Sequence, residues 1–209
     1  MPLDLVVTAI LVVLSQGCKW RAIDQPEANW NSIYQYFRRW CRQGVWTQAF
    51  SRLGPSVCGS TRYLDSTHIK VHRCASNPPG GQAPQAMGRT RGGLNSKLHA
   101  LVDAHSRPVS LLLSAGQEAD IRHAPAVLSG LPAHWLVADK GYDSDPFRDW
   151  LRRRGTRTCI PPRAKRKYPA RFSRKRYRGR HRVENFFERI KNFRRIATRY
   201  DKLAESFFG

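Results

Sequence analysis

Three acidic residues stand where carboxylates could hold a divalent metal ion against a phosphate. Asp65 lies within a strand pattern, Asp139 ends the short apolar run WLVAD, and Glu184 lies near the start of a helical pattern in the most basic part of the chain. Hard cations such as Mg²⁺ take oxygen ligands, usually a few carboxylates together with water and substrate phosphate. A pair of such ions can activate a nucleophile and stabilise a leaving oxygen. The three residues therefore predict metal-dependent chemistry on phosphate.

Each of these carboxylates also has a purely structural interpretation. Asp65 could be a polar residue at a strand edge, Asp139 could cap the turn that follows it, and Glu184 could pair with Arg180. Glu188, one helical turn beyond Glu184, is an alternative metal ligand. None of these residues is specific when it is considered alone.

The last helical pattern carries a row of polar residues, namely Tyr177, Arg180, Glu184 and Lys191. With about 100° of rotation per residue, the four fall within an arc of roughly 60° around a helix. The apolar residues on the other side are Val183, Phe186, Ile190 and Phe193. One face is thus predicted to pack, while the opposite face presents a carboxylate flanked by a phenol and two cations. Gly179 could delay the start of this helix and leave Tyr177 in a loop.

The surrounding patterns predict an α/β fold, a mixed sheet with helices packed on it. Strands are predicted at 61–72, 97–103, 108–114, 135–139 and 156–160. Helices are predicted at 119–130, 145–154 and 181–199, and loops at 75–93 and 161–180. Three strands in succession, followed by alternating helices and strands, are typical of such an architecture. Asp139 would then lie at a strand end, where α/β folds place ligand-facing groups.

Residues 1–58 are predicted to form a small helical N-terminal region. Its apolar run at 5–14 is too short to span a membrane and is not preceded by the basic residues of a signal peptide, so we expect a buried helix. Aromatic residues recur at helical spacing between 28 and 50, with a break at Gly44. They predict either an aromatic core or a pair of DNA-contacting helices, whose outer face would carry Arg38, Arg39 and Arg42.

The net charge of +22 on 209 residues points to a polyanionic partner. The segment 151–209 contains 21 of the 37 Lys and Arg residues but only 4 of the 15 Asp and Glu residues. Nucleic acid is the commonest partner of so positive a surface, with an acidic protein or an anionic membrane surface as alternatives. The hydrophobic fraction of 41% disfavours a wholly disordered basic tail.

Other candidate ligands have weaker support. The five cysteines include no Cys-x-x-Cys pair, which disfavours a structural zinc site or a disulfide framework and suits a reducing cytosol. His68 and His72 would share one face of a strand, but no third zinc ligand lies nearby, so we expect structural or phosphate-contacting roles. Trp135 is expected to pack in the core rather than to stack on a base.

Taken together, these segments resemble the DDE transposases of bacterial insertion sequences, in the family named after insertion sequence five. The similarity is carried by YLDSTHIKVHR (63–73), GRTRGGLNSKLHALVDAHSRPVSLLLSAGQEAD (88–120), WLVADKGYDSD (135–145), IPPRAKRK (160–167) and RHRVENFFERIKNFRRIATRYDKLAESF (180–207). The family's Tyr-x2-Arg-x3-Glu-x6-Lys pattern is matched by Tyr177, Arg180, Glu184 and Lys191. The stretches TAILVVLSQGCKWRAI and NWNSIYQYFRRWCRQGVW resemble its helical N-terminal region.

This resemblance implies a ribonuclease-H-like catalytic domain over 59–209, with Asp65, Asp139 and Glu184 as its catalytic and metal-binding residues. It implies two Mg²⁺ or Mn²⁺ ions and a water, activated by them, that cuts DNA at the ends of the element. The freed 3′-hydroxyl would then attack target DNA in a transesterification.

The resemblance also implies partners and a location. Tyr177, Arg180 and Lys191 would position DNA phosphates near the metal ions. The implied partners are double-stranded DNA, at terminal inverted repeats and at the target, and further copies of the chain in a homo-oligomer. The implied location is the bacterial cytoplasm, at the nucleoid, with no membrane partner.

Two alternative functions accompany this interpretation. Relatives usually extend beyond both ends of this chain, which predicts a copy truncated at both ends. The chain could therefore be an inactive copy that binds DNA without catalysis, or a nuclease of the same fold that cuts but does not join. The three carboxylates favour an enzyme, whereas the short C-terminal end favours the inactive copy.

Overall fold

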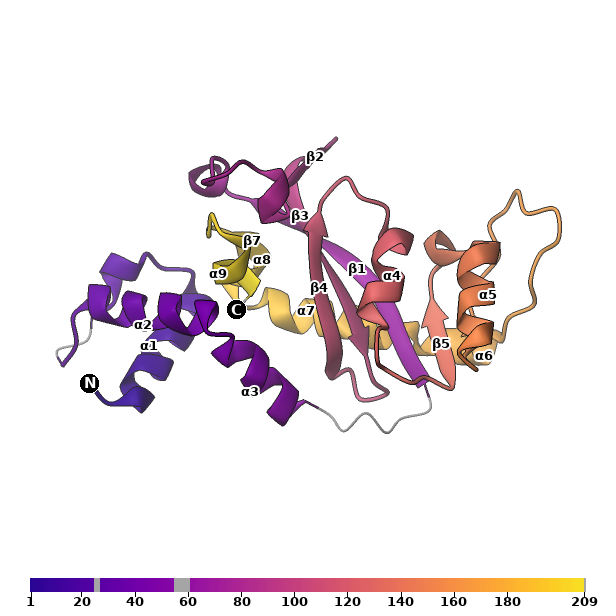
Figure 1. Ribbon diagram of the computed structural model, residues 1–209, viewed down its shortest axis with the longest axis horizontal. Helices are drawn as coiled ribbons and strands as arrows, with labels where there is room; N and C mark the ends of the chain where they lie inside the picture. Colours follow the sequence, from indigo (N-terminus) through magenta and orange to yellow (C-terminus); the bar gives the residue numbers. More distant parts are fainter. Residues whose placement is uncertain (25–26, 55–60, 209) are drawn as a thin grey trace.

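The computed structural model describes residues 1–24, 27–54 and 61–208. The chain begins with a group of helices and continues into a twisted sheet with helices on both faces (Figure 1). The N-terminal helices are α1 (Leu3–Gln16), the 3-10 turn η1 (Trp20–Ala22), α2 (Trp30–Arg42) and α3 (Val45–Leu53). Gly44 joins α2 to α3 with a φ of 67°, a backbone region that glycine adopts without strain. The expected helical N-terminal region, with its turn at Gly44, is confirmed.

These N-terminal helices enclose a core of their own. Val6 and Ile10 of α1 belong to one buried cluster with Ile33 and Phe37 of α2, and Trp20 packs against its edge. One side of the apolar run of α1 is therefore buried, as expected, whereas Leu11 on the other side is 49% exposed. No helix in the part of the chain that the structure describes has the length and apolar character needed to cross a membrane.

The three arginines expected on the outer face of α2 have partners within the chain. Arg38 donates to the Glu205 carboxylate at 3.3 Å, and Arg42 lies 3.8 Å from the same group. The Arg39 guanidinium covers the Tyr36 ring at 4.3 Å from its centroid. These ion pairs hold α2 against the C-terminal helix α9 (Ala204–Phe208). A DNA contact by these arginines stays a prediction.

The mixed sheet is built around β1 (Thr61–Val71). On one side, β3 (Gly93–Val102) pairs antiparallel with β1, and β4 (Pro108–Ala115) pairs antiparallel with β3. On the other side, β5 (Trp135–Ala138) pairs in parallel with β1, and β6 (Arg157–Cys159) pairs in parallel with β5. Two short strands extend the sheet, β2 (Gly88–Thr90) against β3 and β7 (Thr198–Arg199) against β1. This arrangement confirms the expected ribonuclease-H-like mixed sheet with flanking helices.

Different helices cover the two faces of the sheet, because side chains alternate along each strand. The main covering helices are α4 (Asp120–Val127), α5 (Asp145–Arg153) and α7 (His181–Lys191). Leu64 points into the cluster that contains α4 and α5, whereas Tyr63 and Ile69 point into the cluster that contains Val183 of α7. The odd-numbered residues of β1 therefore face α7, and Asp65 is one of them.

The helix expected over 181–199 is shorter in the structure. It ends at Lys191, and after an extended residue the chain forms α8 (Arg194–Ala197) and then β7. No glycine or proline interrupts this stretch, so its local pattern gives no reason to stop. The cause is tertiary, because the last two residues of β1 offer an edge on which β7 pairs in parallel.

Both segments expected as loops contain short regular elements. Residues 75–93 include η3 (Ala83–Gln85) and β2, and residues 161–180 include α6 (Arg174–Tyr177) and η5 (Arg178–Arg180). Tyr177 is therefore helical, and Gly179 lies in a continuous helical path into α7. The glycine is required by close approach rather than by a helix end, since a Cβ there would meet the Tyr63 hydroxyl at 2.7 Å.

Candidate catalytic site

Two of the predicted carboxylates are brought side by side by strand pairing. β1 and β5 are parallel, and their register places Leu64 opposite Ala138. The residue that follows each member of this pair is a predicted aspartate, Asp65 within β1 and Asp139 directly after β5, so the two emerge at the same level of the sheet. Val137 shares the α7-facing cluster with Tyr63, which puts both aspartates on the face that α7 covers.

The turn after β5 holds Asp139 in place. Asp139 caps the 3-10 turn η4 (Lys140–Tyr142), and its Oδ1 accepts a hydrogen bond from the Gly141 amide at 2.8 Å. A Cβ at position 141 would lie 2.8 Å from the same oxygen, so a larger residue there would displace the carboxylate. The capping interpretation of Asp139 is thus present in the structure, and it leaves Oδ2 available for a ligand.

The third carboxylate, Glu184, is linked to one of the aspartates, Asp65, through an arginine. Arg180 Nη1 donates to Asp65 Oδ2 at 2.8 Å and to Glu184 Oε1 at 3.0 Å. Because Arg180 and Glu184 are one turn apart at the start of α7, the helix itself sets this bridge. Among the described residues, the alternative ligand Glu188 forms no hydrogen bond or ion pair with Arg180.

The other members of the polar row also lie along β1. Lys191 Nζ donates to Thr67 Oγ1 at 2.7 Å, and Thr67 shares the face of Asp65. The Tyr177 side chain interacts with the Arg180 guanidinium. The sequence patterns did not single out Thr67 as a site residue. Its position two residues after Asp65 on a strand could have indicated it, because residues at even offsets share a face.

The pKa values of the bridge show how closely its charges are packed. Burial raises the pKa of Asp65 to about 6, and the nearby Asp139 and Asp120 carboxylates add to this rise. The Arg180 guanidinium and a hydrogen bond from the Ser66 amide act in the opposite direction. Burial by itself lowers the pKa of Arg180, but its carboxylate partners outweigh it and raise that pKa above the usual value.

The carboxylates suit a divalent cation in their chemistry. They supply hard oxygen ligands, and Asp65 and Glu184 already turn an oxygen toward a shared positive group. As they stand, no three acidic, His or Cys residues in the described part of the chain are arranged to hold a metal ion. Arg180 lies between Asp65 and Glu184 in the place that a cation would share with them.

The two histidines that were considered as zinc ligands, and expected to have other roles, do not converge. His68 is exposed on the opposite face of β1 from Asp65, where partial desolvation and the Lys97 ammonium lower its pKa. His72 lies beyond the end of β1, and its Nδ1 is 3.1 Å from Cys74 Sγ. The structure therefore gives the zinc alternative no support in the described residues.

Trp135 is only half-buried, so the expectation of a core position is partly wrong. Its ring packs against the α7-facing cluster, and two guanidinium groups cover it. The centroid lies 4.0 Å from Arg176 Cζ and 5.6 Å from Arg157 Cζ.

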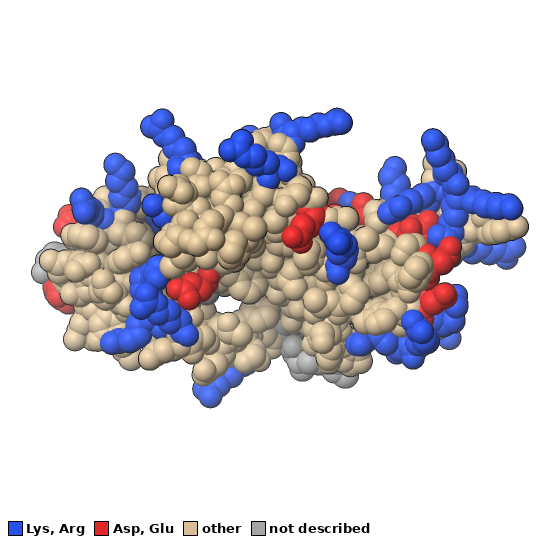
Figure 2. Space-filling view, turned by 45° about the horizontal axis from the view of Figure 1, so that its top comes forward, with Lys and Arg blue, Asp and Glu red and all other residues tan. Residues whose placement is uncertain are grey.

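The basic segment 161–180 is anchored by a buried aspartate. Asp143 is 3% exposed and binds Arg148, Arg166 and the Arg163 amide, each at 2.8 Å. Burial acts to raise the pKa of Asp143, but these three donors outweigh it and hold the pKa below the ordinary value. Lys and Arg side chains gather at this end of the molecule (Figure 2).

Solved structures of low similarity include a piggyBac transposase synaptic complex with hairpin DNA and a simian T-cell lymphotropic virus intasome in complex with a PP2A regulatory subunit. The first is 8% identical with a TM-score of 0.37, over 52% of this chain and 24% of that one. The second is 15% identical with a TM-score of 0.34, over 96% of this chain and 64% of that one. The chain thus spans about a quarter of the first structure and less than two thirds of the second.

Sequence families give a definite assignment. Residues 58–208 match the family model of the transposase DDE domain, and residues 2–50 match that of a putative transposase of the IS4/5 family. A putative transposase for insertion sequence element IS6501 from Brucella ovis is 33% identical over 127 residues, which cover 56% of this chain and 91% of that protein. The chain therefore belongs to the IS4/IS5 family of DDE transposases.

Proposed function

We propose that the chain is a metal-dependent DNA transposase that cuts the ends of an insertion element and transfers the freed 3′-hydroxyl into target DNA. The observation that carries the proposal is the bridge from Asp65 through Arg180 to Glu184, next to Asp139. Carboxylates that lie side by side at the start of a basic helix can bind metal ions, and Asp65, Asp139 and Glu184 are placed in this way. Family membership supports the same reaction class.

In this proposal Asp65, Asp139 and Glu184 hold two Mg²⁺ or Mn²⁺ ions. Such ions, when bound, activate the attacking oxygen and stabilise the leaving oxygen of an in-line displacement. Arg180 keeps Asp65 and Glu184 oriented in the absence of the ions and faces the DNA phosphate when they are present. Tyr177 and Lys191, on the same side of the helix, position neighbouring phosphates.

The partners and the division of the chain belong to the same proposal. The partner is double-stranded DNA, at inverted repeats and at the target, and the active form is a homo-oligomer in the bacterial cytoplasm. Residues 59–209 form the catalytic domain and residues 1–58 a helical region available for DNA contacts. Separate family matches to 2–50 and 58–208 support this division.

The isosteric variant Asp139→Asn tests the site. Asn keeps an oxygen for the Gly141 amide, so the turn is preserved while the carboxylate charge is lost. We expect cleavage of DNA that carries the element's inverted repeats to fall about a thousandfold with Mg²⁺, because several kcal/mol of transition-state stabilisation depend on the ions. Strand cutting is measured on denaturing gels and DNA binding by mobility shift, and binding should be unchanged.

Glu188→Gln is the matched control, since it neutralises the other carboxylate of the same helix. Cleavage by Glu188→Gln should equal that of the unaltered protein. Equal cleavage by Asp139→Asn and the unaltered protein would refute the proposed site. Binding without cutting in the unaltered protein would favour the inactive copy, and cutting without strand-transfer joints would favour the nuclease.

A further inference from the structure

A second group of cations lies on α6 and α7, outside the contacts that hold the carboxylates. Arg182 is two residues from both Arg180 and Glu184, so it points to the opposite side of the helix from them. Its Nε donates to the Ala104 carbonyl at 2.7 Å, in the turn between β3 and β4, and its guanidinium lies over the Tyr63 ring. These contacts fix Arg182 beside the start of β1.

Arg182 lines a basic pocket of about 360 Å³ together with Tyr63, Ser173, Lys175, Arg176 and Gly179. None of the described residues that line it is acidic, and its three cations form no ion pair with a described residue. The buried Nε of Arg176 has no hydrogen-bond partner among the described residues. A buried donor without a partner is unfavourable, and a ligand oxygen would satisfy it.

A second pocket, of about 440 Å³, lies next to the first. Trp135 lines it, and the Arg157 guanidinium at its edge stacks on the same ring that Arg176 covers from the first pocket. Two other arginines of this pocket, Arg148 and Arg152, are ion-paired with aspartates. Arg157 and Arg171 form no ion pair within the described part of the chain, so this pocket also keeps a positive charge. We call the two pockets together the strand-start surface.

The stack on Trp135 gives the strand-start surface a defined geometry. Arg176 and Arg157 lie 4.0 Å and 5.6 Å from the ring centroid, so their guanidinium carbons are no more than about 10 Å apart. Stacked guanidinium groups keep their N–H edges available, and those edges match phosphate oxygens. Two guanidinium groups within that distance can bind oxygens of one phosphate or of neighbouring phosphates on a DNA strand.

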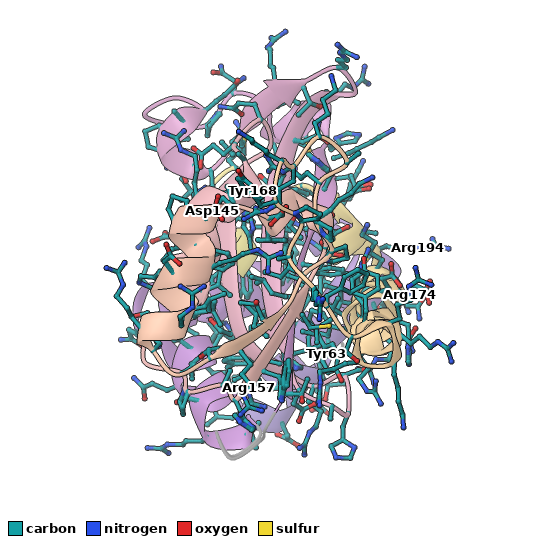
Figure 3. The ribbon with its side chains drawn as sticks, turned by 90° about the vertical axis from the view of Figure 1, so that its right-hand side faces the viewer. Tyr63, Asp145, Arg157, Tyr168, Arg174 and Arg194 are labelled. Atoms are coloured by element: carbon teal, nitrogen blue, oxygen red, sulfur yellow. The ribbon has the colours of Figure 1, made fainter. Side chains whose placement is uncertain are left out.

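From these observations we infer that the strand-start surface binds the phosphate backbone of a DNA duplex outside the carboxylate site. Tyr63 lies between Arg157 and Arg174 on the end of the molecule that presents this surface (Figure 3). The inference rests on the proposed function, because it presumes a DNA-binding protein. It adds residues that lie outside the polar row of α7.

The test uses the full-length double variant Arg157→Gln with Lys175→Gln. Both side chains are exposed, one from each pocket, so the fold should be unaffected. Affinity for a fluorescent duplex of arbitrary sequence is measured across a series of salt concentrations. We expect the slope of log affinity against log salt to become shallower by about one unit for each phosphate that the variant no longer neutralises.

The matched control is Arg52→Gln with Arg122→Gln, which removes two exposed arginines far from the surface in sequence and outside both pockets. Its salt slope should stay closer to that of the unaltered protein. Equal slopes for the two double variants would overturn the inference while leaving the proposed function intact. If the unaltered protein showed no salt-dependent DNA affinity, the proposed function itself would fail. Restoration of the slope by Arg157→Lys with Lys175→Arg would confirm that charge is responsible.

Discussion

At the scale of single residues, Arg180 decides the electrostatics of the candidate site. It binds Asp65 and Glu184 through one nitrogen, and its charge opposes the burial that raises the pKa of Asp65 to about 6. The ordinary pKa of such a carboxyl is 3.8. Between these values the folded protein holds a proton that the unfolded chain has released, so this residue makes folding less favourable as the pH rises from about 4 to 6.

Arg180→Gln is expected to raise the pKa of Asp65 further, because a nearby positive charge is lost. Metal ions bind the ionised carboxylate, so the pH midpoint for Mn²⁺ binding and for DNA cleavage should move upward. Mn²⁺ binding can be followed by calorimetry between pH 5 and pH 8. Lys191→Gln removes a cation that contacts Thr67 instead, and its midpoint should stay in place. A midpoint that Arg180→Gln leaves unchanged would contradict the bridge.

At the scale of elements, the short strand β7 is secured by one buried arginine. Arg199 is 0% exposed and donates to the Gln85 carbonyl at 2.8 Å and to Ser96 Oγ at 2.7 Å. It also donates to the carbonyls of Asp201 and Lys202. Burial lowers its pKa to about 10, which leaves it charged at neutral pH. The C-terminal segment is thereby tied to β3 and to the turn before β2.

Arg199→Leu should destabilise the protein by about 3 kcal/mol or more, because several buried oxygens lose their donor at once. The free energy of unfolding can be measured in urea at neutral pH. Arg194→Leu is the control, since Arg194 is exposed in the neighbouring helix α8 and projects outward (Figure 3). A loss no larger for Arg199→Leu than for Arg194→Leu would show that β7 is not held in this way.

At the scale of the whole molecule, the C-terminal segment joins the N-terminal helices to the sheet. α8 packs on α1 and α9 packs on α2, and Figure 1 shows both between the two parts of the chain. Arg195 donates to the Cys18 carbonyl at 3.3 Å, and Arg38 pairs with Glu205. Glu205 is thus one of only 15 acidic residues in a chain whose net charge is +22.

Self-repulsion of that charge should make folding sensitive to salt. Raising NaCl from about 0.01 M to 0.15 M shortens the screening length from roughly 30 Å to 8 Å. We expect the free energy of unfolding to increase by an amount on the order of 1 kcal/mol, the size of typical surface electrostatic effects. Urea unfolding without DNA measures it. A decrease would mean that surface ion pairs such as Arg38 with Glu205 outweigh the repulsion.

The sequence by itself determined the elements whose patterns are local. Alternation over 61–72 and the apolar runs that follow predicted the strands, and helical spacing predicted α4, α5 and the start of α7. It also singled out Asp65, Asp139 and Glu184, because acids are scarce in this chain and their positions follow the family's motifs. The periodicity of a segment indicates which of its sides is buried, and it can be read from residues that are close together in the chain.

Only the tertiary structure decided which residues from different elements lie next to one another. The parallel register of β1 and β5 put Asp65 next to Asp139, and the packing of α7 on β1 brought Arg180 to Asp65. The same sheet ended the helix at Lys191, because pairing on the free edge of β1 and the buried hydrogen bonds of Arg199 outweighed a continuous helical pattern. Such contacts join residues far apart in the chain, and their energies depend on the packed whole rather than on local sequence.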